Sequence, residues 1–493
     1  MTIIKNQYDL IIIGAGPAGT PISIESAKLD STKSIALIDN LGELGGECLF
    51  HGCIPSKILE ASAKHIKDLE NLKEFGIELN SDSYKLIWKK IKKRKNEILS
   101  KRTKIAKDLA NSVGNIDIIK GFATFNSNNS IEVILKDKTT KILEFRKVVI
   151  ATGSKPIISH YKGDAIDEIM TNDEFFHNME LPETLSIIGS GAIAIEFTQI
   201  LSALGVKINL FVRGDKILKN IDNEAADMIL DKLLNSNNIN LLLNSTIQEI
   251  NHKENQLEIL YTQNSKSKTL ISNKVLSAIG RIANISKLNL EKADVEYNKK
   301  GITTTPQLQT SNKNIFANGD VVANFPKFAH TAQYTSHIVA QNLFLEHNFF
   351  KPNFSKNSWV LFSMPNIVSA GIGENEAKKN KIDIIVDKFD FSTEAKSQIE
   401  NEDYGYMKFI VEKSSKKIIG IVIVHEDANV MGGEASLIIS QKLTLKELID
   451  SIHPHPTMSE AFVMLAKKMM GDIMHEKLTN PIIQSLLKIE RLM

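Results

Sequence analysis

The chain has 493 residues and nearly balanced charge, with 60 basic and 58 acidic side chains, so net charge favours neither nucleic acid nor a membrane surface as a partner. This length predicts two to four domains, and no run reaches the roughly 18 apolar residues of a membrane span. We expect no signal peptide, because the first apolar run ends in a glycine loop. Two cysteines cannot form a disulfide framework, so we expect a cytoplasmic protein in which a disulfide is catalytic.

The first predicted unit is a strand, a glycine loop, a helix and a second strand. The strand is YDLIII, at 8–13, and the loop places glycines at Gly14, Gly16 and Gly19. The second strand, SIALID, ends at Asp39. Such a unit binds a dinucleotide, with the pyrophosphate at the helix N-terminus and the carboxylate on a ribose hydroxyl. The alternative is a glycine-rich turn in another kind of α/β unit.

Both cysteines, Cys48 and Cys53, lie in the segment GGECLFHGCIPSK, at 45–57. A zinc site would need two further ligands, and only His51 lies nearby. Two inert buried thiols and a reversible redox disulfide are the other interpretations. The spacing alone does not decide between them.

A long basic segment follows at 87–109, with the sequence IWKKIKKRKNEILSKRTKIAKDL. Its periodicity predicts a helix with a single apolar stripe. The residues of that stripe are Ile87, Ile91, Ile98, Leu99, Ile105 and Leu109. The basic side is either a solvated surface or a docking site for an acidic partner.

Two strand-to-loop junctions predict that the first domain is interrupted. KVVIATGSKP, at 147–156, is a strand that runs into Gly153, and NIFANGDVV, at 314–322, ends in Asp320. An acid just after a strand end is suited to a ribityl hydroxyl or to water beside phosphates, although it is also a common turn residue. We therefore expect the chain to leave the first domain near residue 150 and to return near residue 280.

Between these junctions the strand–loop–helix–strand pattern recurs at 185–213. Its loop carries Gly189 and Gly191, with Ala194 in the third position. No carboxylate ends the second strand; Arg213 stands there, with Lys219 six residues later. A ribose with a free 2′-hydroxyl favours an acid at this place, whereas a 2′-phosphate favours a cation. The second unit is therefore predicted to prefer NADPH, unless Arg213 is only a surface residue.

Residues 355–493 contain no glycine fingerprint and read as an α+β domain. They include SIHPHPTMSE, at 451–460, which is either a polar turn or a functional loop. Near the end, Asn480 as N-cap and Pro481 as first helical residue predict a short amphipathic helix.

The segments GGECLFHGCIPSK, ATGSKP, ANGDVV and HPHPTMSEAF together resemble the flavin-dependent pyridine nucleotide–disulfide oxidoreductases, and they occur in the family's order. The resemblance implies an α/β fold with two Rossmann-like domains, the NAD(P) domain being inserted in the FAD domain, and a C-terminal α+β dimerisation domain. The predicted domains are an FAD domain at 1–150, an NAD(P) domain at 151–280, a central region with the return of the FAD domain at 281–352, and an interface domain at 353–493.

The resemblance also assigns catalytic roles. Cys53 is then the thiol beside the flavin and Cys48 the thiol that exchanges with substrate. His455 resembles the family's acid/base and Glu460 its orienting carboxylate. The family supplies this histidine from the partner subunit, so the resemblance implies a homodimer.

The remaining site residues implied by the resemblance bind FAD and either NADP(H) or NAD(H), and no metal is expected. Lys57 resembles the lysine beside the flavin, and Glu196 its ion-pair partner. For FAD the residues are Gly14, Gly16, Gly19, Asp39 and Asp320, and further cofactor-binding residues are Ala123, Gly153, Gly280, Arg281 and Ala329. For the nicotinamide nucleotide they are Gly189, Gly191, Arg213 and Lys219.

Within the family, different segments point to different members. HPHPTMSEAF resembles dihydrolipoyl dehydrogenases, while LFVRGDKILK resembles the NADPH segment of glutathione and trypanothione reductases, and KFAHTAQ resembles mercuric-reductase-like members. We expect a dihydrolipoyl dehydrogenase-type enzyme, whose partner includes a lipoyl-bearing acyltransferase of a 2-oxoacid dehydrogenase complex. The alternative is an NADPH-dependent reductase of another disulfide or electrophile. With two cysteines in all, the chain lacks the extra C-terminal pair of mercuric reductase.

Overall fold

The first sheet is built around β1 (Gln7–Ile13), whose apolar run pairs in parallel with β2 (Ile35–Asp39) on one side and β5 (Thr140–Ile150) on the other. Ile11 and Ile12 are fully buried, as expected of a parallel strand covered on both faces. The other strands of this sheet are β3 (Ile116–Phe125), β4 (Ser130–Leu135) and β18 (Ile315–Ala317). The chain returns to this sheet at β18, which lies beside β5.

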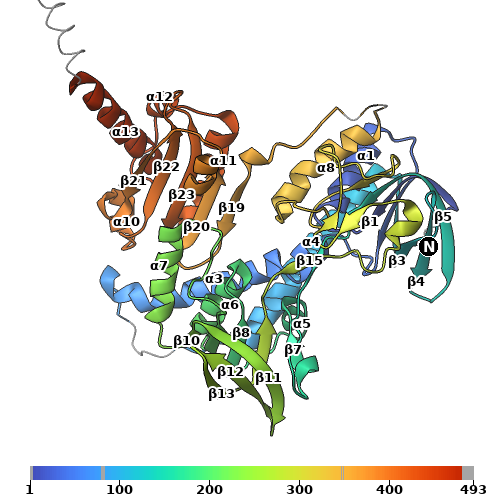
Figure 1. Ribbon diagram of the computed structural model, residues 1–493, viewed down its shortest axis with the longest axis horizontal. Coiled ribbons are helices and arrows are strands. Elements are labelled where there is room, and N and C mark those ends of the chain that lie inside the picture. Colours follow the sequence, from blue (N-terminus) through green and yellow to red (C-terminus); the bar gives the residue numbers. More distant parts are fainter. Residues whose placement is uncertain (1–3, 79–83, 346, 348, 480–493) are drawn as a thin grey trace, which may run out of the picture. The chain divides into compact units, whose positions relative to one another are not determined.

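Two helices from distant parts of the sequence pack together beside this sheet. They are α1 (Gly19–Leu29), which starts at the third glycine of the first fingerprint, and α8 (Ala329–Leu343), as Figure 1 shows. Ser336 on α8 donates a hydrogen bond to the Ala18 carbonyl at 2.8 Å. This hydrogen bond ties the N-terminus of α1 to a helix that comes much later in the chain.

The second sheet is entirely parallel and has the strand order β10-β9-β8-β14-β7. At its centre are β8 (Thr184–Ile188), α6 (Ala192–Ala203) and β9 (Lys207–Phe211), which form the second predicted strand–helix–strand unit. The flanking elements are β7 (Ile169–Met170), α5 (Asn172–Asn178), β10 (Ile239–Leu242) and β14 (Lys274–Ser277). An antiparallel sheet adjoins them in the sequence: β11 (Ser245–Lys253), β12 (Gln256–Gln263) and β13 (Lys266–Ser272).

Short strands lie where the chain passes between the two sheets, and three helices lie between β2 and β3 of the first sheet. The strand β6 (Ser154–Pro156) pairs with β15 (Arg281–Ala283), which brings the two predicted crossings between domains side by side. The helices are α2 (Gly46–Phe50), α3 (Cys53–Asn71) and α4 (Trp88–Val113). Small elements complete the region: β16 (Tyr297–Asn298), β17 (Gly301–Ile302), and 3-10 turns at Leu72–Phe75, Ile166–Glu168 and Leu290–Ala293.

The helix predicted in the basic segment is present as α4, but its apolar stripe does not face the core as a whole. Leu99 is buried, whereas Ile105 and Leu109 are exposed. The buried face includes Lys95 and Thr103 instead. The periodicity identified the helix, and the packing against neighbouring elements selected a different face.

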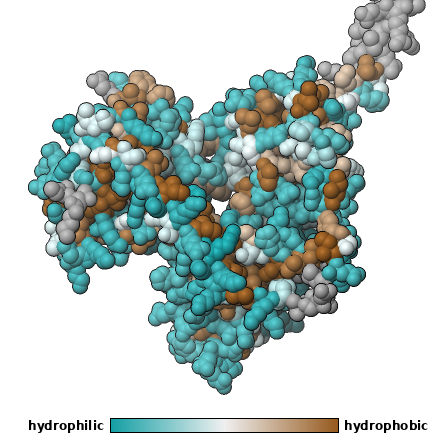
Figure 2. Space-filling model, turned by 180° about the vertical axis from the view of Figure 1, so that it is seen from behind, coloured by the Kyte–Doolittle hydropathy of each residue, from teal (hydrophilic) through white to brown (hydrophobic). Residues whose placement is uncertain are grey.

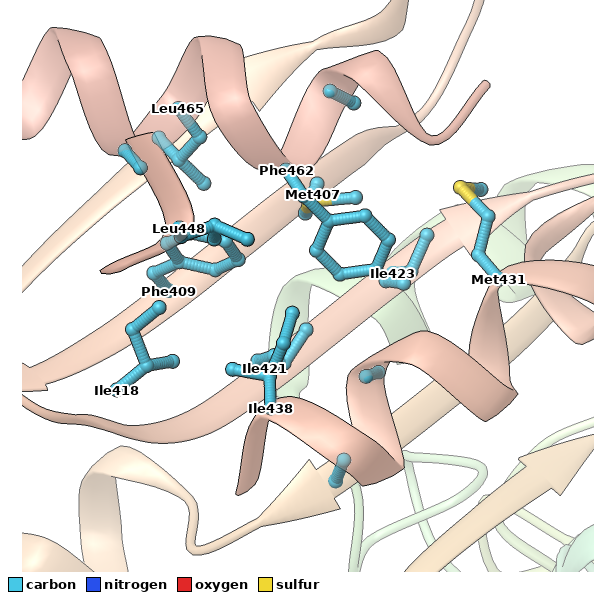
Figure 3. Close-up of a cluster of buried hydrophobic side chains, with 14 of the residues drawn as sticks. Met407, Phe409, Ile418, Ile421, Ile423, Met431, Ile438, Leu448, Phe462 and Leu465 are labelled. Carbon is cyan, nitrogen blue, oxygen red and sulfur yellow. The ribbon is translucent and has the colours of Figure 1, made fainter. Parts of the chain in front are cut away.

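The C-terminal region forms a five-stranded antiparallel sheet in the order β19-β20-β23-β22-β21. Its strands are β19 (Ser358–Leu361), β20 (Asn366–Gly371), β21 (Ile384–Asp390), β22 (Tyr406–Glu412) and β23 (Ile418–His425). Its helices are α9 (Glu374–Lys379), α10 (Ala395–Ile399), α11 (Ala428–Gln441), α12 (Leu445–Ile449) and α13 (Glu460–Thr479), with 3-10 turns at Phe354–Lys356 and Phe391–Thr393. Phe409 and Phe462 lie in the core between sheet and helices (Figure 3).

The described chain divides into two compact units, residues 1–217 with 236–352, and residues 218–235 with 353–493. Both dinucleotide folds lie in the first unit. The second unit includes α7 (Asn223–Leu234), which follows the second dinucleotide fold in sequence; Lys408 on β22 contacts the N-cap Asp222 at 2.8 Å. The finer boundaries expected at residues 150 and 280 stay predictions.

The computed structural model describes residues 4–78, 84–345, 347 and 349–479. The predicted helix at Asn480 and Pro481 lies outside them. Hydrophilic residues cover most of the face seen in Figure 2. Among the described helices, none is both long and apolar enough to cross a membrane.

Candidate active site

The two thiols lie on adjacent helices, and a hydrogen bond couples them. Cys48 is on α2 and Cys53 is the first residue of α3. The hydrogen bond that Cys48 donates lowers the pKa of Cys53, and the Lys57 ammonium lowers it further. The same hydrogen bond raises the pKa of Cys48. The pair is therefore polarised, with thiolate character on Cys53 and the proton on Cys48.

An ion pair ties this segment to the second dinucleotide fold. Lys57 on α3 lies 2.6 Å from Glu196 on α6, and both side chains are largely shielded from solvent. The ammonium sits one helical turn from Cys53, so it stabilises a thiolate there while its position is set by Glu196.

The first fingerprint has the steric features that a pyrophosphate requires. Gly14 has φ +104°, and a Cβ on it would lie 2.4 Å from the Ala151 carbonyl oxygen. A Cβ on Gly19 would lie 1.9 Å from the Gly14 carbonyl oxygen, so no side chain fits there. A Cβ on Gly16 would meet only the Gly46 Cα, at 4.0 Å. The middle glycine thus leaves its backbone open to a ligand, as FAD needs.

Backbone N–H groups of the surrounding loops hold the carboxylate of Asp39 close to the fingerprint turn. It accepts hydrogen bonds from the N–H groups of Ala15 at 3.0 Å, Leu41 at 2.9 Å and Gly42 at 3.2 Å. It is therefore held at the end of β2, within reach of the fingerprint turn.

Four further residues predicted to bind the cofactors, Gly153, Gly280, Arg281 and Asp320, lie at or beside the pairing of β6 with β15. Asp320 accepts a hydrogen bond from Ser154 at 2.7 Å, and Arg281 donates to the Ser154 hydroxyl at 2.9 Å. Gly153 and Gly280 have positive φ, and neither has an atom within 3.4 Å of a built Cβ. Two alanines complete the set: Ala123 is buried on β3, and Ala329 begins α8.

A polar cluster beside the thiols was missed by the sequence reasoning. Arg281 pairs with Glu47 at 2.5 Å, and Asn172 donates to the His51 carbonyl at 2.8 Å and to Glu47 at 3.3 Å. Burial and the charge of Glu47 raise the pKa of Asp173 to about 7, against the opposing charge of Arg281. Residues of α5 and β15 thus hold the segment around the two cysteines through hydrogen bonds and an ion pair.

A sequence signal for part of this cluster existed. Thr171 and Glu174 have the spacing of a capping box, and both of its hydrogen bonds are present at the start of α5. That motif locates the helix start, but nothing in it indicates that Asn172 and Asp173 would meet Glu47.

The second fingerprint has the same sterically required glycines in its first two positions, but an alanine in the third. Gly189 has φ +142°, and a Cβ on it would lie 2.4 Å from the Ala278 carbonyl oxygen; Gly191 has open space. Ala194, in the third position, is fully buried. Arg213 is exposed in the first compact unit, and Lys219 is exposed in the second.

The predicted acid/base lies in the second compact unit, with its carboxylate. Nδ1 of His455 is 2.9 Å from Glu460, and the imidazole is 71% exposed. The Thr457 N–H also donates to Glu460, which lowers the pKa of that carboxyl. The His455–Pro456 bond is cis. A second pair, not predicted, joins His453 to Glu434 at 2.7 Å.

Comparison with known proteins identifies the family. Residues 8–336 match the pyridine nucleotide-disulphide oxidoreductase family, and residues 357–466 match that family's dimerisation domain. The chain is 32% identical to a dihydrolipoyl dehydrogenase of Buchnera aphidicola (from Schizaphis graminum), over 95% of this chain and 96% of that protein. It is 29% identical to the dihydrolipoyl dehydrogenase of Geobacillus stearothermophilus, over 95% and 97%. It is 31% identical to a mercuric reductase of Staphylococcus aureus, over 95% and 83%.

The chain therefore belongs to the pyridine nucleotide–disulphide oxidoreductase family. It is an FAD-dependent, nicotinamide-linked disulfide oxidoreductase with a dimerisation domain, as predicted. No cluster of three or more metal-binding side chains occurs among the residues that the structure describes.

Proposed function

We propose that the protein oxidises a protein-bound or free dihydrolipoyl group and reduces a nicotinamide nucleotide, as a dihydrolipoyl dehydrogenase-type enzyme. The observation that carries this proposal is the polarised Cys48–Cys53 pair with Lys57 one turn away. The names of the relatives from Buchnera and Geobacillus support the choice of dithiol.

The thiol chemistry follows from the two cysteines. With Cys48 and Cys53 joined as a disulfide, a substrate thiolate attacks the Cys48 sulfur and Cys53 leaves as the thiolate that Lys57 stabilises. The second substrate thiol then attacks the substrate sulfur of this mixed disulfide, and Cys48 leaves and takes up a proton. Substrate is oxidised by two electrons and the cysteine pair is reduced by two. FAD, held at the first fingerprint, would supply the two-electron redox chemistry that links the cysteine pair to the nicotinamide nucleotide.

His455 is proposed as the base that removes the substrate thiol protons. Glu460 accepts from its Nδ1, so Nε2 is left to receive a proton, and the carboxylate stabilises the resulting imidazolium. A homodimer is proposed to bring His455 of one subunit to the thiols of the other. The dimerisation domain at 357–466, which contains His455, supports this assembly.

FAD is proposed to lie against Gly14, Gly16 and Gly19, with Asp39 on its ribose and Asp320 and Arg281 near its polar linker. The open backbone at Gly16 supports this placement. The boundaries at 150, 280 and 352 are proposed as the edges of the FAD, nicotinamide and central regions. A cytoplasmic location, and a lipoyl-bearing acyltransferase as partner, belong to the same proposal.

A second candidate is an NADPH-dependent reductase of another disulfide or electrophile. Arg213, standing where a ribose-binding acid is expected, supports it, as does the mercuric reductase relative. The two candidates differ in the substrate and in the direction of electron flow.

Steady-state assays distinguish them. We expect turnover of dihydrolipoamide, and none of glutathione disulfide, when each is offered with both nicotinamides.

Cys48→Ser and Cys53→Ser should each abolish this turnover with FAD retained, and His455→Ala should reduce it by about 10²- to 10⁴-fold. A long-wavelength thiolate–flavin absorption band should persist in reduced Cys48→Ser and vanish in Cys53→Ser. Persistence of the band without Cys53 would overturn the assignment of the two sulfurs.

A further inference from the structure

The segment 212–222, which we call the nucleotide loop, joins β9 to α7 and carries the two cations predicted to bind a 2′-phosphate, Arg213 and Lys219. Its first end is fixed in the first compact unit, where the Asn244 N–H donates to the Gly214 carbonyl at 2.9 Å. Its other end is the N-cap of α7, which lies in the second compact unit. The conformation of the loop therefore depends on how firmly each end is held.

The N-cap of α7, Asp222, has more contacts than a helix cap requires. Its Oδ1 accepts a hydrogen bond from the Ala225 N–H at 3.2 Å, which is the capping contact. The same oxygen accepts from the Tyr406 hydroxyl at 2.7 Å, and Oδ2 accepts from the Lys408 ammonium at 2.8 Å. These two additional contacts fasten the end of the nucleotide loop to β22.

The ammonium of Lys408 has Asp222 as its nearest partner. Lys408 is 6% exposed, and Glu374 at 3.3 Å and Glu224 at 3.5 Å lie farther from its Nζ than Asp222 does. Glu224 also pairs with Lys388 on β21. Although burial opposes the positive charge, the hydrogen bond and the charge of Asp222 raise the pKa of Lys408. The pair stays ionised, so its separation would leave a buried charge without its nearest partner.

Strand β22 is a rigid base for this contact. Side chains alternate between the faces of a strand, so Tyr406 and Lys408 share one face. Met407 and Phe409, on the other face, lie in the buried core of this unit with Phe462 of α13 (Figure 3). The contact to Asp222 is therefore made from a strand that is packed on its opposite face.

The backbone is strained next to Lys219. Leu218 has φ +49°, in the left-handed region, where the Cβ of an L-residue crowds the following carbonyl. Such a conformation persists only where the surroundings enforce it. The Ile221 N–H donates to the Leu218 carbonyl at 3.1 Å, and Asp222 follows directly. The turn that sets the direction of Lys219 thus ends at the residue that β22 holds.

We infer that Lys408 and Tyr406 are positioning residues for the nicotinamide nucleotide. Acting through Asp222, they hold the nucleotide loop in the conformation that binds the adenosine end of the nucleotide. This inference rests on the proposed function and concerns residues that act through the loop. With the loop fixed in advance, its conformational entropy is lost on folding and not on binding, which increases the affinity for the nucleotide.

The test uses the intact enzyme with FAD bound. Calorimetry measures the Kd of adenosine 2′,5′-bisphosphate and of 5′-AMP, and steady-state kinetics measure KM for both nicotinamide nucleotides and for dihydrolipoamide. In Lys408→Met we expect the KM of the preferred nucleotide and the Kd of its adenosine fragment to rise about 10-fold, which corresponds to about 1.4 kcal/mol. The kcat, the FAD content and the KM for dihydrolipoamide should stay at their wild-type values. Tyr406→Phe should give a smaller rise, because it keeps the ion pair.

Two further variants separate positioning from a loss of structure. Asp222→Ser keeps an N-cap residue but removes the carboxylate, so it should raise the same constants, and adding Lys408→Met should then change little. Tyr404→Phe is the matched control for Tyr406→Phe. The Tyr404 hydroxyl contacts Glu426 and not Asp222, so nucleotide binding should keep its wild-type value. If Lys408→Met does not fold, Asp222→Ser and Tyr406→Phe decide the test.

Unchanged nucleotide constants in Asp222→Ser and Tyr406→Phe would overturn the inference, as would a loss of FAD or of kcat in parallel with the loss of nucleotide affinity. If the wild type prefers NAD(H), the same rise is expected for NAD(H) and 5′-AMP, and its absence overturns the inference equally. Failure of the proposed function is a separate result. In that case dihydrolipoamide is not oxidised, while calorimetry with the adenosine fragments still measures the effect of each variant on the loop.

Discussion

The two dinucleotide folds of the first compact unit share a pattern and differ at two positions. In the first fold the third fingerprint residue is Gly19, where a Cβ would lie 1.9 Å from the Gly14 carbonyl oxygen. In the second fold the same place holds Ala194, fully buried against its surroundings. The helix and the loop are therefore closer together in the first fold than in the second.

The folds also differ where the second strand ends. Asp39 accepts three backbone hydrogen bonds and is held in place, whereas Arg213 is exposed. The first fold is thus fixed around its ligand site, which suits a cofactor that stays bound. The second fold keeps an exposed cation, which suits a nucleotide that comes and goes.

The largest effect is expected when the third fingerprint residues of the two folds, Gly19 and Ala194, are exchanged. Gly19→Ala should lose FAD and lower the free energy of unfolding by about 3 kcal/mol, because the methyl group collides with a carbonyl of the same loop. Flavin released on denaturation and urea unfolding measure the two effects. The reverse change, Ala194→Gly, should lower stability by only about 1 kcal/mol through helix propensity. Equal tolerance of both changes would show that the two folds are packed alike.

The second test concerns the nucleotide. NADP(H) is expected to bind better than NAD(H), and Arg213→Glu should reduce kcat/KM for NADP(H) by about 10- to 150-fold, the value of one charge-assisted hydrogen bond of about 1.5–3 kcal/mol. Lys219→Gln provides a milder comparison. Preference of the wild type for NAD(H), with no change in Arg213→Glu, would contradict the prediction.

The third test addresses the cluster where the two folds meet the thiol segment. The pKa of Asp173 is raised to about 7, so the folded protein holds this proton more tightly than the unfolded chain. Stability should therefore fall as pH rises from about 4 to about 7, and remain lower above it.

Asp173→Asn should remove that dependence. Because the carboxyl is only half-buried, we expect a gain on the order of 1–2 kcal/mol above pH 7 and little difference near pH 4. Urea unfolding at both pH values measures it. Glu47 shares the cluster, so Glu47→Gln should give a similar pH profile. Parallel pH profiles of wild type and Asp173→Asn would contradict the assignment.

The smallest expected effect is at the ion pair between the folds. Glu196 raises the pKa of Cys53, while Lys57 lowers it. Glu196→Gln should therefore lower the pKa of Cys53 slightly, by a fraction of a unit, provided that Lys57 keeps its place. The pH dependence of Cys53 alkylation in Cys48→Ser reports it. A rise would mean that Lys57 moves away when its partner is lost.

Local sequence was sufficient for the fold. The strands before Gly14 and Gly189 and the helices after them lie where the apolar runs and glycines predicted. These features depend on contacts between close neighbours in sequence, such as a Cβ that cannot coexist with a carbonyl five residues away. The cysteine segment could likewise be located, because both cysteines and Lys57 lie within ten residues, but its spacing left the chemistry of the two thiols open.

What only the tertiary structure decided involves residues that are distant in sequence. Glu47, Asp173 and Arg281 meet because β6 pairs with β15 and α5 follows β7, and no local pattern encodes that meeting. The buried side of α4 was also decided by packing: Lys95 is covered because the α5 carbonyls accept its hydrogen bond, while Ile105 stays exposed. Periodicity reports which residues could share a face, but the energy of burial depends on which neighbour that face meets.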